Sequence, residues 1–227
     1  MILQFELQTM STARNIEVNI QEFVIAGWAG RDRHAIEHHI EELATIGVPR
    51  PSRVPLFYRV DAHQLTQEPL IQVVGNGSSG EVETFVFMHE GELCVSITSD
   101  HTDRKLETVS VALSKQACSK PVGRVAWRYA DLADYWDELE IRSSIQEQGK
   151  SVEYQHGKVA SLQHPLDLIA AYTDGMGLAP HCAMSCGTVA TIGQIRPAAS
   201  FEMSLHDHRR QRVIRHRYDV DFLPEVA

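Results

Sequence analysis

Polar and apolar residues alternate along much of the chain, and this spacing predicts β-strands with one buried face. The alternation is clear at Ile16, Val18 and Ile20, and it returns in the C-terminal third of the sequence. Short apolar runs bounded by glycine, proline or asparagine predict further strands. The predicted strands cover residues 1–7, 15–26, 56–60, 71–74, 139–145, 151–154, 183–189, 201–205 and 212–220, with turns at 155–157 and 206–211.

Apolar residues at helical spacing predict a small number of short helices between these strands. The helices are predicted over residues 31–46, 103–117, 131–138 and 165–172. Their apolar stripes include Ile36, Ile40 and Leu43 in the first helix and Leu106, Val109 and Leu113 in the second. Gly47 is expected to end the first helix, and Pro165 is expected in the first turn of the last one. The chain is therefore expected to be an α+β protein that is rich in β-structure.

The segment 79–115 is predicted to contain a central β-hairpin, entered through a loop over 75–80 and followed by a helix. His89-Glu90-Gly91 is short enough to form the hairpin turn. Side chains alternate between the two faces of a strand, so residues two apart share a face. The sets expected to share a face are Glu81, Glu83, Phe85 and Phe87 on the first strand, and Glu92, Cys94, Ser96, Thr98 and Asp100 on the second.

Composition limits the class of protein. The 227 residues are 43% hydrophobic and 22% charged, as in an ordinary globular protein of one domain. The formal net charge of −9 argues against a nucleic-acid partner, because binding phosphates needs a basic surface. No segment approaches ~18 consecutive apolar residues, which argues against a membrane span. Four cysteines without a CxxC pair, and an N-terminal segment without a basic region before an apolar stretch, predict a cytoplasmic protein with reduced thiols.

Three carboxylates of the hairpin are candidates to meet at one point. Glu81 and Glu83 share a face of the first strand, and Asp100 ends the second strand. A pocket of carboxylate oxygens is what a hard divalent cation such as Mg²⁺ requires. The alternative is that all three are solvated, as most acidic side chains are. Phe85 and Phe87 on the same face as the glutamates favour a site that is not simply exposed to water.

The predicted helix over 31–46 is rich in histidine and glutamate. A His–Glu dyad for proton transfer or water activation is one interpretation, and a metal site or a solvated polar face are the alternatives. His39 and Glu42 flank the apolar stripe and are expected to face the protein interior, whereas His38 projects towards the wetter face. The registers His39/Glu42 and His38/Glu41 both stay open, and the helix-face argument favours the first.

Two further segments contain candidate binding residues. Thr102 or Asp103 is a good N-cap for the following helix, and Lys115 is a candidate to hold a substrate carboxylate or enolate oxygen. The segment 185–188, Ser-Cys-Gly-Thr, is either a strand end with a glycine bulge or a cradle for a carboxylate. Cys186 with His181 as base is disfavoured as a nucleophile, because no nucleophile elbow accompanies it.

The order of these motifs resembles the fumarylacetoacetate hydrolase superfamily from about residue 26 to residue 205, and within it a bacterial branch described only as a domain of unknown function. The matching motifs are the Glu-x-Glu of Gly80–Glu83, the Asp-x-Thr-x-Arg of Asp100–Arg104, Lys115, Gly187-Thr188, and the segment Arg31–Glu42 followed by Pro55-Leu56-Phe57. Val189 replaces the family's proline after Thr188, and Glu107 stands where relatives often have glutamine, so the substrate stays open.

This resemblance implies a mixed β-roll of that superfamily as a single domain over 1–227. Its parts would be N-terminal strands over about 1–26, a lid helix and connector over 27–60, and a metal-binding core over 61–227. It implies Mg²⁺ or Mn²⁺, with Ca²⁺ as a further candidate, on Glu81, Glu83 and Asp100. The implied catalytic residues are His39, Glu42, Lys115 and, in the other register, His38; the implied substrate-binding residues are Gly187, Thr188, Arg104 and Cys186.

The resemblance also implies a function. A divalent-metal-dependent enzyme would act on a 2-oxo acid or a β-dicarbonyl carboxylate, by hydrolysis of a C–C bond or by decarboxylation through a metal-stabilised enolate. The alternatives are an isomerase or hydratase of the same superfamily, a non-catalytic module that binds a small acid or a metal, and a structural subunit of a homodimer. The expected partners are a small carboxylate substrate and a second copy of the chain.

Overall fold

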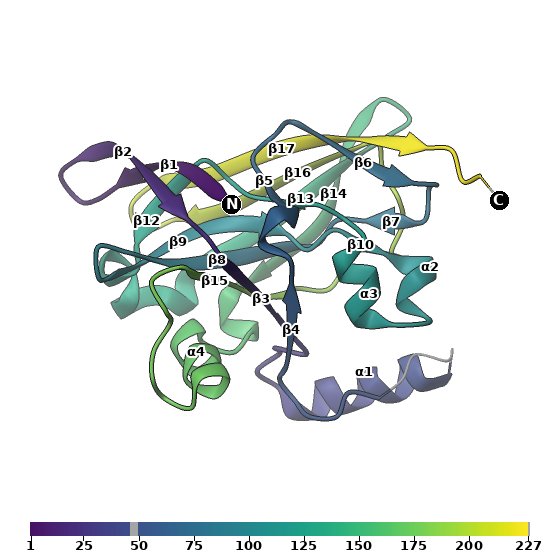
Figure 1. The fold of residues 1–227 in the computed structure, drawn as a ribbon, viewed down its shortest axis with the longest axis horizontal. Coiled ribbons are helices and arrows are strands. Elements are labelled where there is room, and N and C mark those ends of the chain that lie inside the picture. Colours follow the sequence, from purple (N-terminus) through teal and green to yellow (C-terminus); the bar gives the residue numbers. More distant parts are fainter. Residues whose placement is uncertain (46–49, 227) are drawn as a thin grey trace.

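The computed structural model describes residues 1–45 and 50–226, and its largest element is a sheet of eight strands (Figure 1). The strands are β1 (Ile2–Gln8), β2 (Ala13–Asn19), β3 (Glu22–Gly27), β4 (Leu56–Val60), β8 (Val82–His89), β9 (Glu92–Ser99), β12 (Val125–Arg128) and β15 (Cys182–Thr188). Their order across the sheet is β2-β1-β12-β9-β8-β15-β3-β4. The predicted hairpin is therefore confirmed as β8 and β9, and it lies at the centre of the sheet.

A second sheet of five strands packs on the first. Its strands are β6 (Leu70–Val74), β13 (Glu140–Glu147), β14 (Lys150–Lys158), β16 (Ser200–Asp207) and β17 (Arg212–Leu223), in the order β14-β13-β16-β17-β6. Two short ladders complete the β-structure: β5 (Leu65–Thr66) with β11 (Lys120–Pro121), and β7 (Ser78–Ser79) with β10 (Thr102–Asp103). The second ladder joins the residues on either side of the hairpin, so it fixes how the hairpin begins and ends.

The helices are short and lie outside the two sheets, with α1 and α4 below the larger sheet in Figure 1 and α2 and α3 at its side. They are α1 (Arg33–Thr45), α2 (Arg104–Glu107), α3 (Val111–Gln116) and α4 (Pro165–Thr173), with 3₁₀ turns η1 (Ala62–Gln64), η2 (Tyr129–Asp131), η3 (Ala133–Glu138) and η4 (Val159–Ser161). Within the described ranges, none of the helices is both long and apolar enough to cross a membrane.

Apolar side chains fill both faces of β8, because the larger sheet curls. On one face, Val82 and Val86 belong to the core that also contains Ile141 and Leu205 of the second sheet. On the other face, Phe87 stacks on Phe5 of β1 with ring centroids 4.6 Å apart, although β12 and β9 lie between these two strands in the sheet order. Contact between strands so far apart in the order requires the sheet to bend back on itself. Stacked rings of this kind add about 0.5–1.5 kcal/mol to the contribution of burial.

The predicted strand over 15–26 is two strands in the structure, β2 and β3. The prediction of a turn at 155–157 is wrong, because these residues lie within β14. Gly157 closely approaches Val189, since a Cβ on it would lie 2.9 Å from the Val189 side chain. The glycine therefore serves close packing in a strand rather than a turn. The predicted loop over 75–80 also contains β7.

The single helix predicted over 103–117 is two helices, α2 and α3. Asp103 caps α2 as expected, but Ser110 takes an extended conformation and its side chain accepts from the backbone N–H of Leu113, so it starts a new helix. Val109 and Leu113, predicted to share an apolar face, are 72% and 56% exposed. In the first predicted helix, Ile36 and Ile40 are buried as expected, while residues 46–49 and the side chain of Leu43 lie outside the described part of the chain.

Candidate functional site

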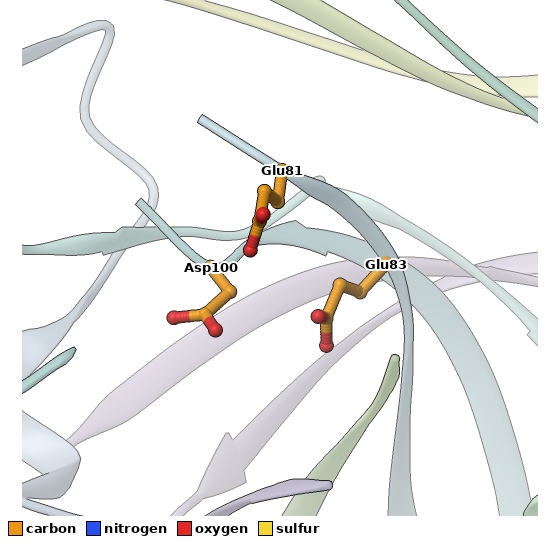
Figure 2. A group of neighbouring side chains, drawn as sticks. All are labelled: Glu81, Glu83 and Asp100. Atoms are coloured by element: carbon orange, nitrogen blue, oxygen red, sulfur yellow. The ribbon is translucent and has the colours of Figure 1, made fainter. Parts of the chain in front are cut away.

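Glu81, Glu83 and Asp100 meet at one end of the central hairpin, as predicted. Glu83 lies on β8, Glu81 immediately precedes this strand, and Asp100 immediately follows β9. The backbone N–H of Asp100 donates to the carbonyl of Glu81 at 2.9 Å, which continues the hairpin ladder beyond both strands. One carboxylate oxygen from each residue lies within 4.8 Å of the other two, and Figure 2 shows the three carboxylates pointing toward one another.

The three carboxylates are not solvated, so the alternative of an exposed acidic face is wrong. Glu83 is 3% exposed and Asp100 is 1% exposed, and the side chain of Glu81 is 16% exposed. Three oxygen donors at this spacing match the preference of Mg²⁺ and Mn²⁺, which take six oxygen ligands at about 2.0–2.2 Å. The donor set therefore fits a hard divalent cation, with Glu81 on the side that reaches solvent.

Asp100 holds two lysines. Lys115, on α3, donates from Nζ to Asp100 Oδ2, and Lys120, on β11, places Nζ 3.1 Å from Asp100 Oδ1. Lys120 is 0% exposed, and its ammonium also donates to the carbonyl of His101. The catalytic candidate Lys115 is thus at the site, and Lys120 is a second cation that the sequence analysis missed. Two helices separate Lys120 from Asp100 in the sequence, so no local sequence pattern predicts that they meet.

Arg104 positions Glu81. Arg104 Nη2 lies 2.9 Å from Glu81 Oε1, while Nε donates to Ser79 Oγ at 2.8 Å and Nη1 to Glu107 Oε2 at 3.0 Å. The contact with Glu81 is an ion pair without hydrogen-bond geometry, so Arg104 Nη2 has no hydrogen-bond acceptor among the described residues. Arg104 was predicted to bind substrate. In the structure it contacts Ser79, Glu81 and Glu107 at the edge of the carboxylate cluster.

Gly187 and Thr188 lie beside Glu83. The backbone N–H of Gly187 donates to Glu83 Oε2 at 3.1 Å, and Gly187 takes φ +85°, which glycine adopts without strain. The Thr188 hydroxyl donates to the carbonyl of Val82 at 2.7 Å and accepts from Gln155 Nε2 at 2.8 Å. Thr188 therefore links β15 to β8, and its hydroxyl proton is already donated to the carbonyl of Val82. Gln155 was hidden from the sequence analysis by the wrong turn prediction.

The charges in the cluster shift several pKa values. Burial, followed by the charge of Asp100, raises the pKa of Glu83 to about 8, and Lys115 only partly offsets this. Burial would also raise the pKa of Asp100, but Lys115 and Lys120 outweigh it and lower this pKa. Burial opposes the charged form of Lys115, yet Asp100 and Glu81 raise its pKa above the ordinary value. Near neutral pH the cluster therefore contains an ionised Asp100, a charged Lys115 and a largely protonated Glu83.

Tyr58 of β4 covers Lys115. The Lys115 Nζ lies 5.6 Å from the centroid of the Tyr58 ring, close enough for a cation–π contact. Burial raises the pKa of Tyr58, and a hydrogen bond between its side chain and Trp28 acts in the opposite direction. A Cβ on Gly27 would lie 2.7 Å from the Tyr58 ring, so this glycine leaves the space that the ring needs. Tyr58 was not among the predicted site residues.

The remaining predicted residues make no contact with the carboxylates within the described part of the chain, or have side chains outside it. His38 is exposed on α1, and the side chains of His39 and Glu42 lie outside the described residues. Cys186 is 1% exposed and packs in the main core, where burial, followed by the charge of Glu83, raises its thiol pKa. This environment keeps the thiol protonated and is unsuited to a nucleophile.

A protein-family model described as "Protein of unknown function (DUF2848)" matches residues 26–218 of the chain. No curated protein gives a significant match.

Among solved structures, the chain is similar to Cg1458 with inhibitor, with 14% identity, a TM-score of 0.66 and coverage of 93% of this chain and 81% of that one. It is similar to 2-keto-3-deoxy-D-arabinonate dehydratase complexed with magnesium and 2,5-dioxopentanoate, with 12% identity, a TM-score of 0.64 and coverage of 95% and 78%. It is also similar to fumarylacetoacetate hydrolase from psychrophilic Exiguobacterium antarcticum, with 13% identity, a TM-score of 0.58 and coverage of 94% and 80%. The predicted β-rich fold of the fumarylacetoacetate hydrolase type is confirmed.

Proposed function

We propose that this chain, which belongs to the DUF2848 family of proteins of unknown function, is a divalent-metal-dependent enzyme that acts on a 2-oxo acid or a β-dicarbonyl carboxylate. The observation that supports this most is the buried convergence of Glu81, Glu83 and Asp100. Burial of acids is costly unless cations accompany them. Asp100 and Glu81 have such partners in Lys115, Lys120 and Arg104, whereas Glu83 has no ion pair among the described residues, and a bound cation would supply one. The similar dehydratase structure contains magnesium and a small dioxo acid, which supports the same ligand class here.

The residues of the chain have separate roles in this proposal. Mg²⁺ or Mn²⁺ on the three carboxylates would supply Lewis-acid stabilisation of negative charge that develops on substrate oxygens. Lys115 contributes a positive charge next to the same position, because its ammonium contacts Asp100. Arg104 and the Gly187 N–H hold Glu81 and Glu83 in place. The His39/Glu42 dyad on α1 stays a prediction for proton transfer.

Hydrolysis of a C–C bond or decarboxylation is the proposed reaction. Dehydration is a second candidate, since one of the similar folds is a 2-keto-3-deoxy-D-arabinonate dehydratase. In all three reactions negative charge develops on an enolate oxygen of the substrate, and a cation with a neighbouring ammonium would stabilise that charge in each case. We further propose a homodimer, as the sequence resemblance implies, and a cytoplasmic location, as the cysteine pattern and the N-terminal segment suggest.

Metal binding and turnover test this proposal separately. Calorimetric titration with Mg²⁺ and Mn²⁺ is expected to give one site in the parent and at least a tenfold weaker site in Glu81→Gln and Asp100→Asn. Glu107→Gln serves as the matched control, because Glu107 contacts Arg104 and is not one of the three carboxylates. Equal metal affinity in the parent and in Asp100→Asn would show that the carboxylates do not form the metal site.

Turnover is then assayed with acylpyruvates, oxaloacetate and 2-keto-3-deoxy sugar acids, following the loss of enol absorbance or the release of pyruvate. Metal-dependent turnover of at least one substrate class is the expected result. A parent that binds metal but turns over none of them would instead be a non-catalytic module for small acids.

A further inference from the structure

The two lysines on Asp100 differ in how firmly they are held. Lys120 has no exposed surface, and its ammonium has a second acceptor in the carbonyl of His101. Its strand, β11, pairs with β5 and follows directly from the core residue Cys118. Lys115 belongs to α3, a helix of six residues whose Leu113 is 56% exposed. Lys115 is itself 6% exposed, but among the described residues its ammonium donates to Asp100 alone, so Lys120 is the more firmly held of the two lysines.

The ammonium of Lys115 contacts one of the three carboxylates that a metal would need. Lys120 contacts Asp100 Oδ1 and Lys115 contacts Oδ2, so both oxygens of Asp100 have an ammonium beside them. The charges of Glu81 and Glu83 also act on Lys115, so its ammonium lies in the field of all three carboxylates. A divalent cation and an ammonium on the same carboxylate repel each other, because the buried site has little water to screen them.

We propose that Lys115 is the internal counter-ion of the three carboxylates, and that its ammonium leaves Asp100 when a divalent cation binds and then serves as the anion-binding group for a small carboxylate. This inference rests on the proposed function, because it assumes that the carboxylates bind a divalent cation. It adds an order of binding: the carboxylate ligand meets a free ammonium only after the cation is in place.

The surroundings of Lys115 give the released ammonium a position to occupy. The face of the Tyr58 ring lies 5.6 Å from Nζ, and an aromatic face stabilises a cation that is not in an ion pair. Tyr58 is fixed by the space that Gly27 leaves for its ring. The ammonium already lies at this distance from the ring while it contacts Asp100, so it can leave Asp100 and keep the contact with the ring. The ammonium would remain beside the carboxylate cluster, where it could contact a small carboxylate.

Magnesium affinity tests the first half of the proposal. Calorimetric titration with Mg²⁺ alone, at pH 8.5 to limit protonation of Glu83, compares the parent with Lys115→Met, Lys115→Arg and Lys105→Met. Lys115→Met is expected to bind Mg²⁺ at least tenfold more tightly, and Lys115→Arg is expected to bind like the parent. Lys105→Met is the matched control, because Lys105 lies on α2 and pairs with Glu225 instead of the site. Equal Mg²⁺ affinity in Lys115→Met and the parent would overturn the proposal.

Oxalate binding tests the second half. The parent with saturating Mg²⁺ is expected to bind oxalate at least tenfold more tightly than Lys115→Met with Mg²⁺. If Lys115→Met binds oxalate as well as the parent does, Lys115 is not the anion-binding group. If neither the parent nor Lys115→Met binds Mg²⁺, the proposed function itself fails. If only Lys115→Met binds Mg²⁺, the cation does not displace Lys115 in the parent, and the proposed displacement is overturned.

A measurement on the unaltered chain covers the case in which Lys115→Met does not fold. The parent is labelled with ¹³C-lysine, and the ε-methylene signal of Lys115 is assigned from the spectrum of Lys115→Arg. Addition of Mg²⁺ is expected to move this signal more than any other lysine signal, since only Lys115 changes partner. A Lys115 signal that stays in place while Mg²⁺ binds would refute displacement.

Discussion

Replacing Asp100 with asparagine removes the carboxylate that Lys115 and Lys120 share, and we predict a large loss of stability in the absence of metal. Lys120 is 0% exposed and would keep only neutral acceptors, the carbonyl of His101 and at best the new amide oxygen, for a full positive charge. Breaking a buried ion pair by removing one partner costs roughly 3–5 kcal/mol. For a chain of this size, such a loss lowers the melting temperature by about 6–20 °C.

The assay is urea unfolding followed by tryptophan fluorescence in the presence of EDTA, for Asp100→Asn, Lys115→Met and the double variant. In the parent, Lys115→Met removes one of two cations from Asp100; in the Asp100→Asn background it removes an unpaired charge. Lys115→Met should therefore cost at least ~1 kcal/mol less in that background. Asp103→Asn is the matched control, because asparagine also caps a helix, and it should stay within about 0.5 kcal/mol of the parent. An Asp100→Asn variant that loses less than ~1 kcal/mol, or equal costs of Lys115→Met in both backgrounds, would refute the reasoning.

Three further predictions concern pH and packing. Because the pKa of Glu83 is raised to about 8, a cation that binds below this pH must displace the proton of Glu83, so Mg²⁺ affinity should rise with pH up to about 8 and then level off. Calorimetry in buffers of different ionisation enthalpy should detect the released proton. An Mg²⁺ affinity that does not depend on pH would contradict this prediction. Burial lowers the pKa of His216 to about 4, so between pH 6.5 and pH 4 the unfolded chain binds a proton that the folded chain does not, and the free energy of unfolding falls as the pH decreases. His216→Phe should remove roughly 3 kcal/mol of this loss of stability. If the variant keeps the same dependence of stability on pH, His216 is not its source. A Cβ on Gly80 would lie 2.6 Å from the Tyr218 hydroxyl, so Gly80→Ala should lower the free energy of unfolding, measured in urea, by about 1–3 kcal/mol. The control is Gly77→Ala, where the new Cβ would meet the flexible Lys105 side chain, and it should lower the free energy of unfolding clearly less.

The part of the site that the sequence predicts is the part that local periodicity determines. Residues two apart on a strand share a face, so Glu81 and Glu83 could be placed beside Phe85 without knowledge of the fold. The short hairpin turn then set the register that brings Asp100 next to Glu81. Hairpin, carboxylates and β-rich class all follow from spacing within 20 residues, and all three are confirmed.

The parts that the sequence did not predict depend on contacts between distant segments. Lys120 reaches Asp100 because β11 pairs with β5, a two-residue ladder without a sequence pattern of its own. Gln155 forms hydrogen bonds with Val82, 73 residues away in sequence, and with Thr188, 33 residues away. Gly157, two residues after Gln155, made this segment resemble a turn. The break between α2 and α3 depends on the choice of Ser110 as a second N-cap, which competes with continuing one amphipathic helix. For Lys120 and Gln155, tertiary contacts overrode the local preference, whereas at Ser110 one local preference prevailed over another.

The cations around the carboxylates, of which only Lys120 was not predicted from the sequence, change how the whole site should be understood. Glu81, Glu83 and Asp100 alone would be a strongly negative pocket in a chain of net charge −9, and such a pocket would repel the anionic substrate proposed for it. Lys115, Lys120 and Arg104 contribute as many positive charges within contact of these acids. With Glu83 largely protonated, these cations offset the remaining negative charge before any metal binds, and a divalent cation would make the cluster more positive. Because the metal adds positive charge next to Lys115, attraction of a carboxylate is expected to depend on the metal, and the charge of the rest of the chain is of little consequence at this distance.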